Sequence, residues 1–287
     1  MITRRSAADI IVVNDGSSDG TAAKLANYTA EGRLSVMTVP NGGPSRARNL
    51  AIARANGEYI AFTDSDCLAK NNWLEQLLYA LKQFPEAAGA GGIQISPEDE
   101  SEFGKKVNRF LFSVGFVADY MKRGGKITYT AHNPSCNSLY RREVLVKAGL
   151  FDETLWPGED VDLDHRIKLL GYKQIFNPGA QVFHYRPQSY AVFSKMMERY
   201  GYVQAKLVKK HGIFRFLHIE PILLLLSLLA CVYLSLSNPL YVLMLLLSLV
   251  IIIELYFYFR SGAFYLLLLM RTLFSWNLGF ARGIMSK

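Results

Sequence analysis

The residues best suited to chemistry are two carboxylates at the end of a short apolar run. Asp64-Ser65-Asp66 directly follows residues 58–63, which predict a strand. Two carboxylates two positions apart at a strand end can both turn toward one cation. Hard oxygen ligands suit Mg²⁺ or Mn²⁺, and such a cation would bridge the two phosphates of a nucleotide. A lone pair of this kind also arises by chance, but this one stands among other polar strand ends.

A second acidic group begins at Glu159 and alternates acidic with apolar residues as far as Asp164. A calcium-binding EF-hand loop is excluded, because His165 and Gly171 stand where that loop needs glycine and glutamate. The segment predicts a helix ended by Gly171, with Glu159 and Asp160 in its first turn and with Asp160 and Asp164 on one face. Its apolar stripe consists of Leu163, Ile167 and Leu170. Two interpretations of the first-turn acids are open: stabilisation by the helix dipole, or a general base held beside a cleft.

A third polar segment, Asp15-Gly16-Ser17-Ser18-Asp19-Gly20-Thr21, follows the first apolar run. Its glycines permit a tight turn, and its Ser and Asp side chains can cap the next helix. On loop chemistry alone, a plain strand–turn–helix connection accounts for the segment. Neither a Walker A sequence nor a G-x-G-x-x-G pattern occurs, so a P-loop or dinucleotide site has no support.

These groups need a scaffold, and hydrophobic patterning predicts one in which strands alternate with helices. The expected strands are Ile10–Asn14, Leu34–Val39, Glu58–Thr63 and Ala90–Ile95. The expected helices are Thr21–Tyr28, Pro44–Ala55 and Asn71–Phe84. This alternation predicts an α/β fold with a mainly parallel sheet and helices on both faces. Such a sheet binds ligands beyond the carboxyl ends of its strands.

The composition combines two unlike parts. Of the 287 residues, 51% are hydrophobic, the formal net charge is +8, and there are three cysteines. The cysteines are too few and too scattered for a disulfide framework or a Cys-rich metal site, and reduced cytosolic thiols fit best. Residues 221–253 carry no charge, enough for two helices of about 17–20 residues across a bilayer. The expected hairpin consists of Leu217–Leu236 and Pro239–Phe259, joined at Asn238-Pro239.

Flanking charges predict the orientation of this membrane region. Residues 195–215 are rich in Lys and Arg, whereas the hairpin turn has no charge. By the positive-inside rule, the N-terminal part is cytoplasmic in a multi-pass protein of the inner or plasma membrane. A further apolar stretch, Ala263–Gly283, contains Arg271 at its centre and Arg282 near its end. Two interpretations are open: a third span with a functional arginine, or an interfacial helix on the membrane surface.

Four segments, taken together and in order, resemble the inverting family 2 glycosyltransferases of the GT-A fold. The resemblance covers about Ile10 to Ser189. The segments are IIVVNDGSSDGT, NGGPSRARNLAIARANGEYIAFTDSD, NPSCNSLYRREVLVKAGLFDETLWPGEDVDLDHRIKLLGY and NPGAQVFHYRP. The resemblance implies transfer of a sugar from a nucleotide-sugar donor to an acceptor hydroxyl, with inversion and with Mg²⁺ or Mn²⁺ as cofactor.

The resemblance also implies roles for individual residues. Asp160, or Glu159 beside it, would be the catalytic base that deprotonates the acceptor hydroxyl. The nucleotide would be bound by Asp15, Arg48 and Asp64. The metal ligands would be Asp64, Asp66 and His184. His184 has a second interpretation as a packed strand histidine, and Trp156 and Tyr185 have two roles open to them, stacking on sugars or packing.

Two departures from the family pattern add to the expectations. The family has a further strand and helix where this chain has only the residues before Ile10, so we expect an N-terminally truncated domain with exposed strand edges. No Q-x-x-R-W sequence occurs, which favours a single sugar addition over a processive polysaccharide synthase.

The expected organisation is a GT-A-like catalytic domain over residues 1–194, a basic juxtamembrane helix over 195–216 and a membrane region of two or three helices over 217–287. The expected partners are the nucleotide-sugar donor, a lipid-linked or envelope glycan acceptor and membrane lipids, with no nucleic acid. The basic helix would hold the domain near anionic lipid headgroups. Two alternatives are open: a polyprenyl-phosphate sugar synthase, whose acceptor is a lipid phosphate, and an inactive scaffold or binding subunit of an envelope-assembly complex.

Overall fold

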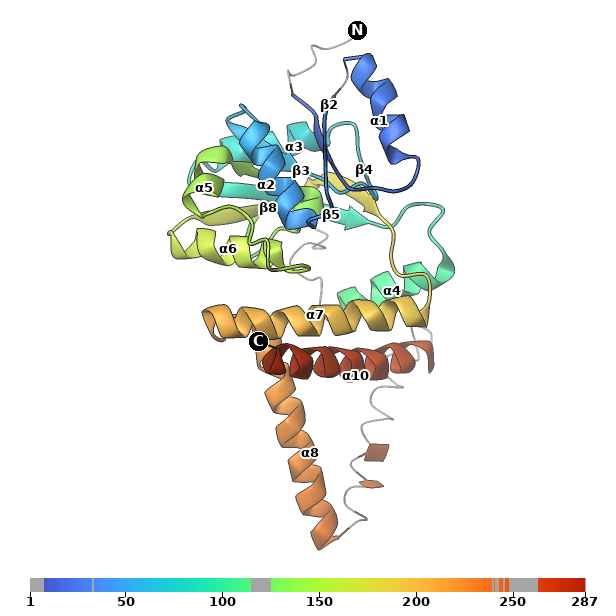
Figure 1. Ribbon diagram of the computed structural model, residues 1–287. Coiled ribbons are helices and arrows are strands. Elements are labelled where there is room, and N and C mark those ends of the chain that lie inside the picture. The colour runs from blue at the N-terminus through green and yellow to red at the C-terminus, as the bar shows by residue number, and fades with distance from the viewer. Residues whose placement is uncertain are drawn as a thin grey trace. The chain divides into compact units, whose positions relative to one another are not determined.

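The structure is a computed structural model in which the described residues are 8–32, 34–114, 125–238, 240, 243–244, 246–247 and 263–286. The chain divides into two compact units (Figure 1). The first consists of Met1–Glu100 and Gly115–Tyr185, and the second of Ser101–Val114 and Arg186–Lys287. The predicted domain boundary at residues 194 and 195 therefore falls inside the second unit.

The first unit begins with a small parallel sheet that follows the predicted pattern. Strand β1 (Ile11–Asp15) pairs with β2 (Ser35–Val39) across helix α1 (Thr21–Ala30), with Ile11 opposite Ser35. Among the described residues, β1 pairs with β2 alone. The other edge of β1 therefore has no partner strand in this part of the chain, and the expected truncation stays a prediction.

The larger sheet of the first unit has six strands in the order β3-β7-β5-β8-β4, with β6 beside β8. They are β3 (Tyr59–Phe62), β4 (Cys67–Ala69), β5 (Ala87–Ile95), β6 (Thr128–Thr130), β7 (Ser138–Arg141) and β8 (Lys173–His184). The α/β class is confirmed, but the sheet is mixed rather than mainly parallel. Only β5 and β8 run parallel among its described pairings. The reason is that β4, β6 and β7 have only three or four residues, too few for periodicity to reveal, and all pair antiparallel.

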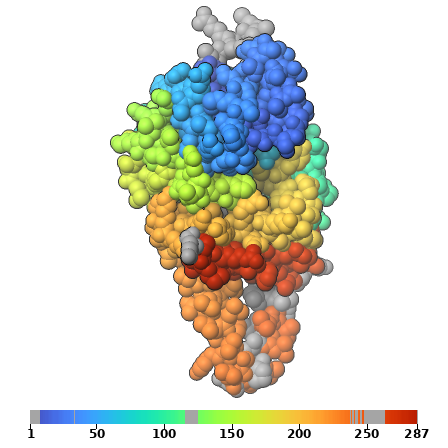
Figure 2. All heavy atoms as spheres, in the orientation of Figure 1, coloured from blue at the N-terminus to red at the C-terminus, as the bar shows by residue number. Residues whose placement is uncertain are grey.

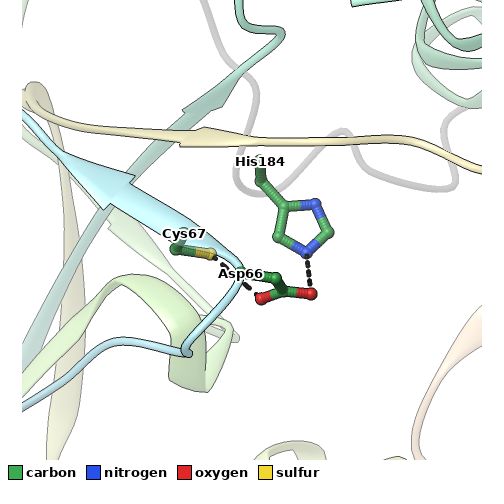
Figure 3. A group of neighbouring side chains, drawn as sticks. All are labelled: Asp66, Cys67 and His184. Carbon is green, nitrogen blue, oxygen red and sulfur yellow. Dashed lines mark hydrogen bonds and ion pairs between the residues drawn. The ribbon is translucent and has the colours of Figure 1, made fainter. Parts of the chain in front are cut away.

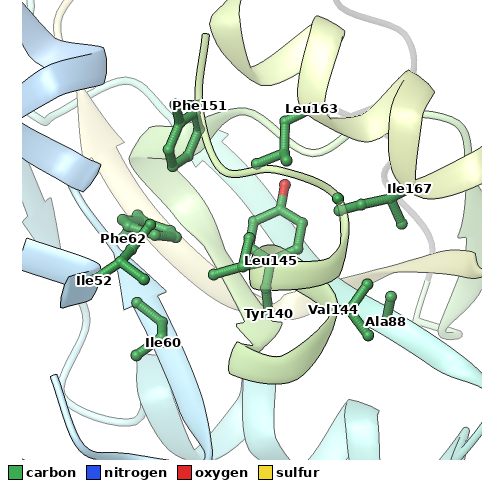
Figure 4. Packing of buried hydrophobic residues seen from close by; sticks show 11 residues of the cluster. Ile52, Ile60, Phe62, Ala88, Tyr140, Val144, Leu145, Phe151, Leu163 and Ile167 are labelled. Atoms are coloured by element: carbon green, nitrogen blue, oxygen red, sulfur yellow. The ribbon is translucent and has the colours of Figure 1, made fainter. Parts of the chain in front are cut away.

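Helices cover both faces of the larger sheet, as predicted. Adjacent residues of a strand point to opposite faces, and in β7 Leu139 and Tyr140 belong to different hydrophobic clusters. Figure 4 shows Tyr140 packed among side chains of α2, α5 and α6. Leu139 packs with α3 on the other face. The helices are α2 (Pro44–Arg54), α3 (Trp73–Gln83), α5 (Arg142–Lys147) and α6 (Glu159–Leu169).

The central strand β5 is built from small residues because its neighbours approach its backbone closely. A Cβ atom added to Gly92 would lie 1.9 Å from the carbonyl oxygen of Ala180 on β8. One added to Gly91 would lie 2.2 Å from Oδ1 of Asn133. These distances are far below any van der Waals contact, so the sheet can close around β5 only with glycine at both positions.

The second unit is helical. Its helices are α4 (Glu102–Ser113), α7 (Tyr190–His211), α8 (Glu220–Ser237) and α10 (Ala263–Met285). Helix α4 belongs to it because Phe110 packs against rings of both α7 and α10, at 6.1 Å from Phe193 and 6.4 Å from Tyr265. This amphipathic helix was not among the predicted elements.

Helix α10 lies alongside α7 at the distance of backbone contact (Figure 1). A Cβ atom on Gly279 of α10 would lie 1.9 Å from the carbonyl oxygen of Glu198, and one on Gly201 of α7 would lie 2.0 Å from that of Trp276. Glycine at a helix interface permits such an approach. The Arg271 guanidinium donates to Ser194 Oγ at 3.1 Å, so the arginine at the centre of α10 has its partner on α7.

The predicted membrane hairpin is described only in part. Helix α8 corresponds to its first helix, whereas most of Pro239–Phe259 lies outside the described residues. In the described part of the chain, α10 alone is both long and apolar enough to cross a membrane. Figure 2 shows atoms of α8 (orange) and α10 (red) at the surface. Exposed apolar side chains of these helices include Leu225, Leu229, Leu236, Met270 and Phe274.

The packing of β5 leads to a test of the sheet. We expect Gly92→Ala to lower the free energy of unfolding by at least about 2 kcal/mol, because the new methyl group meets backbone that cannot move aside. Gly20→Ala is the matched control: Gly20 has a φ of −71° and nothing within 4 Å of an added Cβ. Chemical denaturation of the purified full chain measures both, and equal stability of the two variants would contradict the described sheet.

Candidate active site

Three of the predicted site residues are joined to one another, because Asp64 and Glu159 both bind the guanidinium group of Arg48 on α2. Its Nη2 donates to Asp64 Oδ1 at 2.7 Å, and its Nη1 donates to Glu159 Oε1 at 2.6 Å. Asp64 follows β3 and Glu159 begins α6, so this one guanidinium connects α2 and the neighbouring strand end with a helix more than 100 residues later. The guanidinium also lies 5.6 Å from the centre of the Phe151 ring. Charge-assisted hydrogen bonds of this kind are the strong ones in proteins, and here they hold the two acidic groups together.

The first turn of α6 presents two acids with different surroundings. Gly158, with a φ of 106°, turns the chain into the helix, so that Glu159 and Asp160 occupy the first turn as predicted. The Glu159 side chain is only 5% exposed and is committed to Arg48. Asp160 is 17% exposed, and its Oδ2 accepts a hydrogen bond from the backbone N–H of Ser135 at 3.2 Å. Asp160 is therefore the more accessible of the two carboxylates.

The pKa of Glu159 also departs from that of an ordinary glutamate. Burial, followed by the neighbouring charge of Asp160, raises the pKa of Glu159 to about 7, although Arg48 acts in the opposite direction. Strongly perturbed carboxyl groups are concentrated at functional sites, because catalysis and ion pairing both require buried charge.

Asp164, one turn after Asp160, anchors a buried hydrogen-bond network that sequence patterns do not reveal. Its Oδ2 lies 2.7 Å from His132 Nδ1 and its Oδ1 accepts from the Tyr140 hydroxyl at 2.8 Å. His132 Nε2 in turn lies 3.9 Å from Asp160 Oδ2. The predicted common face of Asp160 and Asp164 is confirmed, since one imidazole contacts both. The only signal in the sequence is the short run of mostly polar residues 132–138.

Asp15 holds the loop that leads into α2. Its two carboxylate oxygens accept the backbone N–H groups of Gly42 and Gly43, both at 2.8 Å. These contacts reach 27 and 28 residues along the chain, so they lie outside the local strand–turn–helix connection expected for this segment. Because each carboxylate oxygen can accept a second hydrogen bond, the predicted contact with a nucleotide is chemically open and stays a prediction.

A second polar group lies where β4 and β8 meet and consists of Asp66, Cys67 and His184 (Figure 3). Their potential ligand atoms all lie within 4.8 Å of one another. Asp66 and His184 are thus brought together as predicted. Asp64, the third predicted ligand, is not part of this group and is bonded to Arg48 instead. Cys67 is the unpredicted member. The Asp66 carboxylate, the Cys67 thiol and the His184 imidazole are all groups that bind divalent cations.

The buried thiol of Cys136 has a strongly perturbed pKa. A hydrogen bond with Cys67, burial and the charges of Asp64 and Asp160 all raise its pKa. Asp64 after β3 and Asp160 on α6 therefore both act electrostatically on this one buried side chain.

Comparisons with known proteins agree with this geometry. The model of the family described as Glycosyl transferase family 2 matches residues 4–149. The chain is 28% identical over 202 residues to the probable glycosyltransferase YdaM of Bacillus subtilis (strain 168), covering 67% of this chain and 47% of that protein. It is 36% identical over 174 residues to glycosyltransferase GlyG of Streptococcus pneumoniae serotype 4, covering 58% of each. The chain therefore spans about half the length of these curated relatives.

The fold is also similar to a solved structure. The mannosyltransferase PcManGT from Pyrobaculum calidifontis, in complex with GDP-Man and Mn²⁺, superposes with a TM-score of 0.64 at 19% identity. The match covers 96% of this chain and 77% of that one. At this identity the likeness establishes the GT-A fold predicted from the sequence.

The raised pKa of Glu159 leads to a test by pH. Between about pH 4.3, where an ordinary Glu titrates, and about pH 7, the folded protein holds a proton that the unfolded chain has released. The stability that this proton contributes is complete at low pH and is lost as the pH rises through 7. Relative to Glu159→Gln, the wild-type free energy of unfolding should therefore fall by up to about 3 kcal/mol across this window. Denaturation curves at several pH values measure it.

Glu153→Gln is the control for this measurement, because Glu153 is exposed and contacts only Asn49 among the described hydrogen bonds. Its stability should follow the wild type at every pH. Parallel pH curves for wild type and Glu159→Gln would show that Glu159 titrates normally.

Proposed function

Because the chain belongs to glycosyltransferase family 2, we propose that it transfers one sugar from a nucleotide-sugar donor to an acceptor hydroxyl, with inversion at the anomeric carbon. The observation that carries the proposal is the bridge from Arg48 to both Asp64 and Glu159. It keeps the acid at the strand end, proposed for the donor side, close to the first turn of α6, proposed for the acceptor side.

Asp160 is the proposed catalytic base. It is more exposed than Glu159 and has no arginine partner among its described contacts. The acceptor hydroxyl gives its proton to this carboxylate while its oxygen bonds to the anomeric carbon. The bond from that carbon to the diphosphate oxygen breaks on the opposite face, which produces inversion. A positioned carboxylate that removes a proton in this way contributes about 10²–10⁴-fold to the rate.

Glu159 is the proposed positioning residue beside the base. Its bond with Arg48 fixes the first turn of α6, and therefore the direction in which Asp160 points. Asp164 and His132 support the same helix from its buried side. A carboxylate held from two directions loses little freedom when the acceptor binds, which favours the reactive geometry.

The nucleotide is proposed to bind at the carboxyl ends of β1 and β3, near Asp15, Arg48 and Asp64. Asp66 and His184, with Asp64 as a further candidate, would hold a divalent cation, Mg²⁺ or Mn²⁺. When bound, such a cation neutralises charge that develops on the leaving diphosphate. The Mn²⁺ and GDP-Man in the similar Pyrobaculum structure support this assignment.

The acceptor is proposed to lie beside Trp156, which precedes the first turn of α6. This side chain is 53% exposed, so packing alone does not account for it. An exposed indole three and four residues before the first-turn acids Glu159 and Asp160 is a surface on which a sugar ring can stack. A lipid-linked or envelope glycan acceptor fits this surface.

The assignment of the base is tested with Asp160→Asn. We expect its turnover to fall by at least about 100-fold, because the amide cannot accept the hydroxyl proton, while donor affinity stays within about twofold. Release of nucleoside diphosphate from a panel of UDP- and GDP-sugars, with product detection, measures turnover. Glu102→Gln, an exposed acid of α4, should match the wild type. Full turnover in Asp160→Asn would assign the base elsewhere, and nucleotide binding without turnover of any donor would indicate a binding subunit.

The second unit is proposed to attach the enzyme to the cytoplasmic face of a membrane. Many leucines of α8 are exposed in the described structure, which is costly in water and favourable in lipid. The basic residues near the end of α7 suit anionic headgroups on that face. Helix α10 has the length of a span, but its arginines bond to α7, a helix rich in charge. This contact favours the interfacial interpretation of residues 263–283.

Membrane attachment is tested by charging the exposed face of α8. Leu225 and Leu229 are both 57% exposed and lie near the middle of the helix. Lysine at the centre of a membrane helix costs about 2.5–3.5 kcal/mol, so the double variant Leu225→Lys/Leu229→Lys should be largely released by an alkaline carbonate wash that leaves the wild type in the membrane pellet. Leu169→Lys, on the equally exposed end of α6, should stay with the wild type. Wild-type protein in the soluble fraction would contradict the proposal.

A further inference from the structure

The thiol of Cys67 lies in the cation-binding group rather than beside it. Its Sγ is 3.7 Å from Asp66 Oδ1, and His184 Nε2 is 3.9 Å from Asp66 Oδ2. Figure 3 shows the thiol and the imidazole on either side of the Asp66 carboxylate. Two ligands on opposite sides of one ion would be about 4.4 Å apart, from typical metal–sulfur and metal–nitrogen bond lengths. The potential ligand atoms of the three residues all lie within 4.8 Å of one another, so only a small movement of the side chains would bring them to that spacing.

The backbone enforces this proximity. In the antiparallel pair of β4 and β8, Cys67 stands directly opposite His184. Directly opposite residues point to the same face with Cβ atoms about 4.5–5.5 Å apart. Asp66 immediately precedes the strand, and its side chain is 71% exposed, so the group opens to solvent on one side. An arriving ion can therefore reach all three side chains and retain open positions for water or phosphate oxygens.

We propose that Cys67 is a direct ligand of the divalent cation, and that its thiolate makes the site prefer Mn²⁺, Co²⁺ or Zn²⁺ to Mg²⁺. This inference rests on the proposed cation site of the glycosyltransferase and adds to it a ligand and a selectivity. Mg²⁺ demands hard oxygen ligands in nearly ideal octahedral geometry, whereas thiolate and imidazole suit softer transition metals. A site with one carboxylate, one imidazole and one thiolate therefore discriminates against Mg²⁺.

The neighbouring thiol does not share this position. Cys136 is buried, accepts a hydrogen bond from Gln94 Nε2 at 3.0 Å and lies outside the group of converging ligand atoms. It is the demanding control, because it is close to Cys67 yet should not bind the ion. Cys231, on α8 of the second unit, is the remote control.

Cobalt spectroscopy tests the ligand directly. Purified, reduced full-length protein is titrated with Co²⁺, alone and with GDP or UDP, and its absorption spectrum is recorded. A thiolate-to-cobalt charge-transfer band in the near ultraviolet is expected in the wild type, in Cys136→Ser and in Cys231→Ser. It should vanish in Cys67→Ser, in which Asp66 and His184 still bind Co²⁺ about tenfold or more weakly. Circular dichroism confirms that each variant is folded.

Selectivity is tested by competition between Mn²⁺ and Mg²⁺ in the same proteins. The ratio of the Mg²⁺ to the Mn²⁺ dissociation constant should fall about tenfold in Cys67→Ser, because the soft ligand is lost. Cys67→Asp replaces the thiolate with a hard carboxylate, so it should bind Mg²⁺ more tightly than the wild type does.

The outcomes separate this inference from the proposed function. Cobalt binding to the wild type without a charge-transfer band, or a band that persists in Cys67→Ser, would overturn the role of Cys67 and leave the proposed cation site intact. An unchanged Mg²⁺ to Mn²⁺ ratio in both Cys67 variants would overturn the selectivity. If the wild type binds no Co²⁺, Mn²⁺ or Mg²⁺ even with a nucleoside diphosphate, the proposed cation site itself fails.

Discussion

The structure of the candidate site depends on the double ion pair of Arg48. A guanidinium that is largely removed from water needs a carboxylate partner, because an uncompensated buried charge costs about 3–5 kcal/mol. Asp64 supplies that charge, and the Glu159 carboxyl, whose pKa is about 7, accepts a second hydrogen bond. Arg48 therefore ties the loop after β3 and the start of α6 to α2, although hydrophobic packing alone would leave these polar segments free to separate. The proposed donor and acceptor sides of the site are thus kept together by charge.

The buried network around Asp164 complements this bridge. His132, Tyr140 and Asp164 exchange hydrogen bonds away from solvent, where each bond is stronger and each unmet group is more costly than in water. The network fixes the second turn of α6 against β7, while Arg48 fixes the first turn from the other side. Asp160 lies between them on an element that cannot rotate, which suits a group required to meet a substrate in one orientation.

The second unit uses a different kind of packing. Gly201 and Gly279 bring α7 and α10 into backbone contact, which adds van der Waals attraction along the two helices to a core that includes Phe110, Phe193 and Tyr265. The arginines of α10 then find partners on α7, and apolar side chains of α8 and α10 are left at the surface. The pairing of these arginines with α7 and the exposed apolar side chains of α8 are in keeping with the proposed attachment to a membrane.

The sequence by itself determined the local features: the α/β class, the acids after β1 and β3, the helix that begins at Glu159, and family 2 membership. The first three depend on periodicity or turn chemistry within a few residues, and family membership depends on four motifs taken in order along the chain. Only the tertiary structure decided the mixed sheet, the bridging role of Arg48, the network of Asp164 and the place of Cys67 opposite His184. Those features come from strand register and from contacts between residues far apart in the chain. Such pairings depend on how all the elements pack together, and no local pattern specifies them.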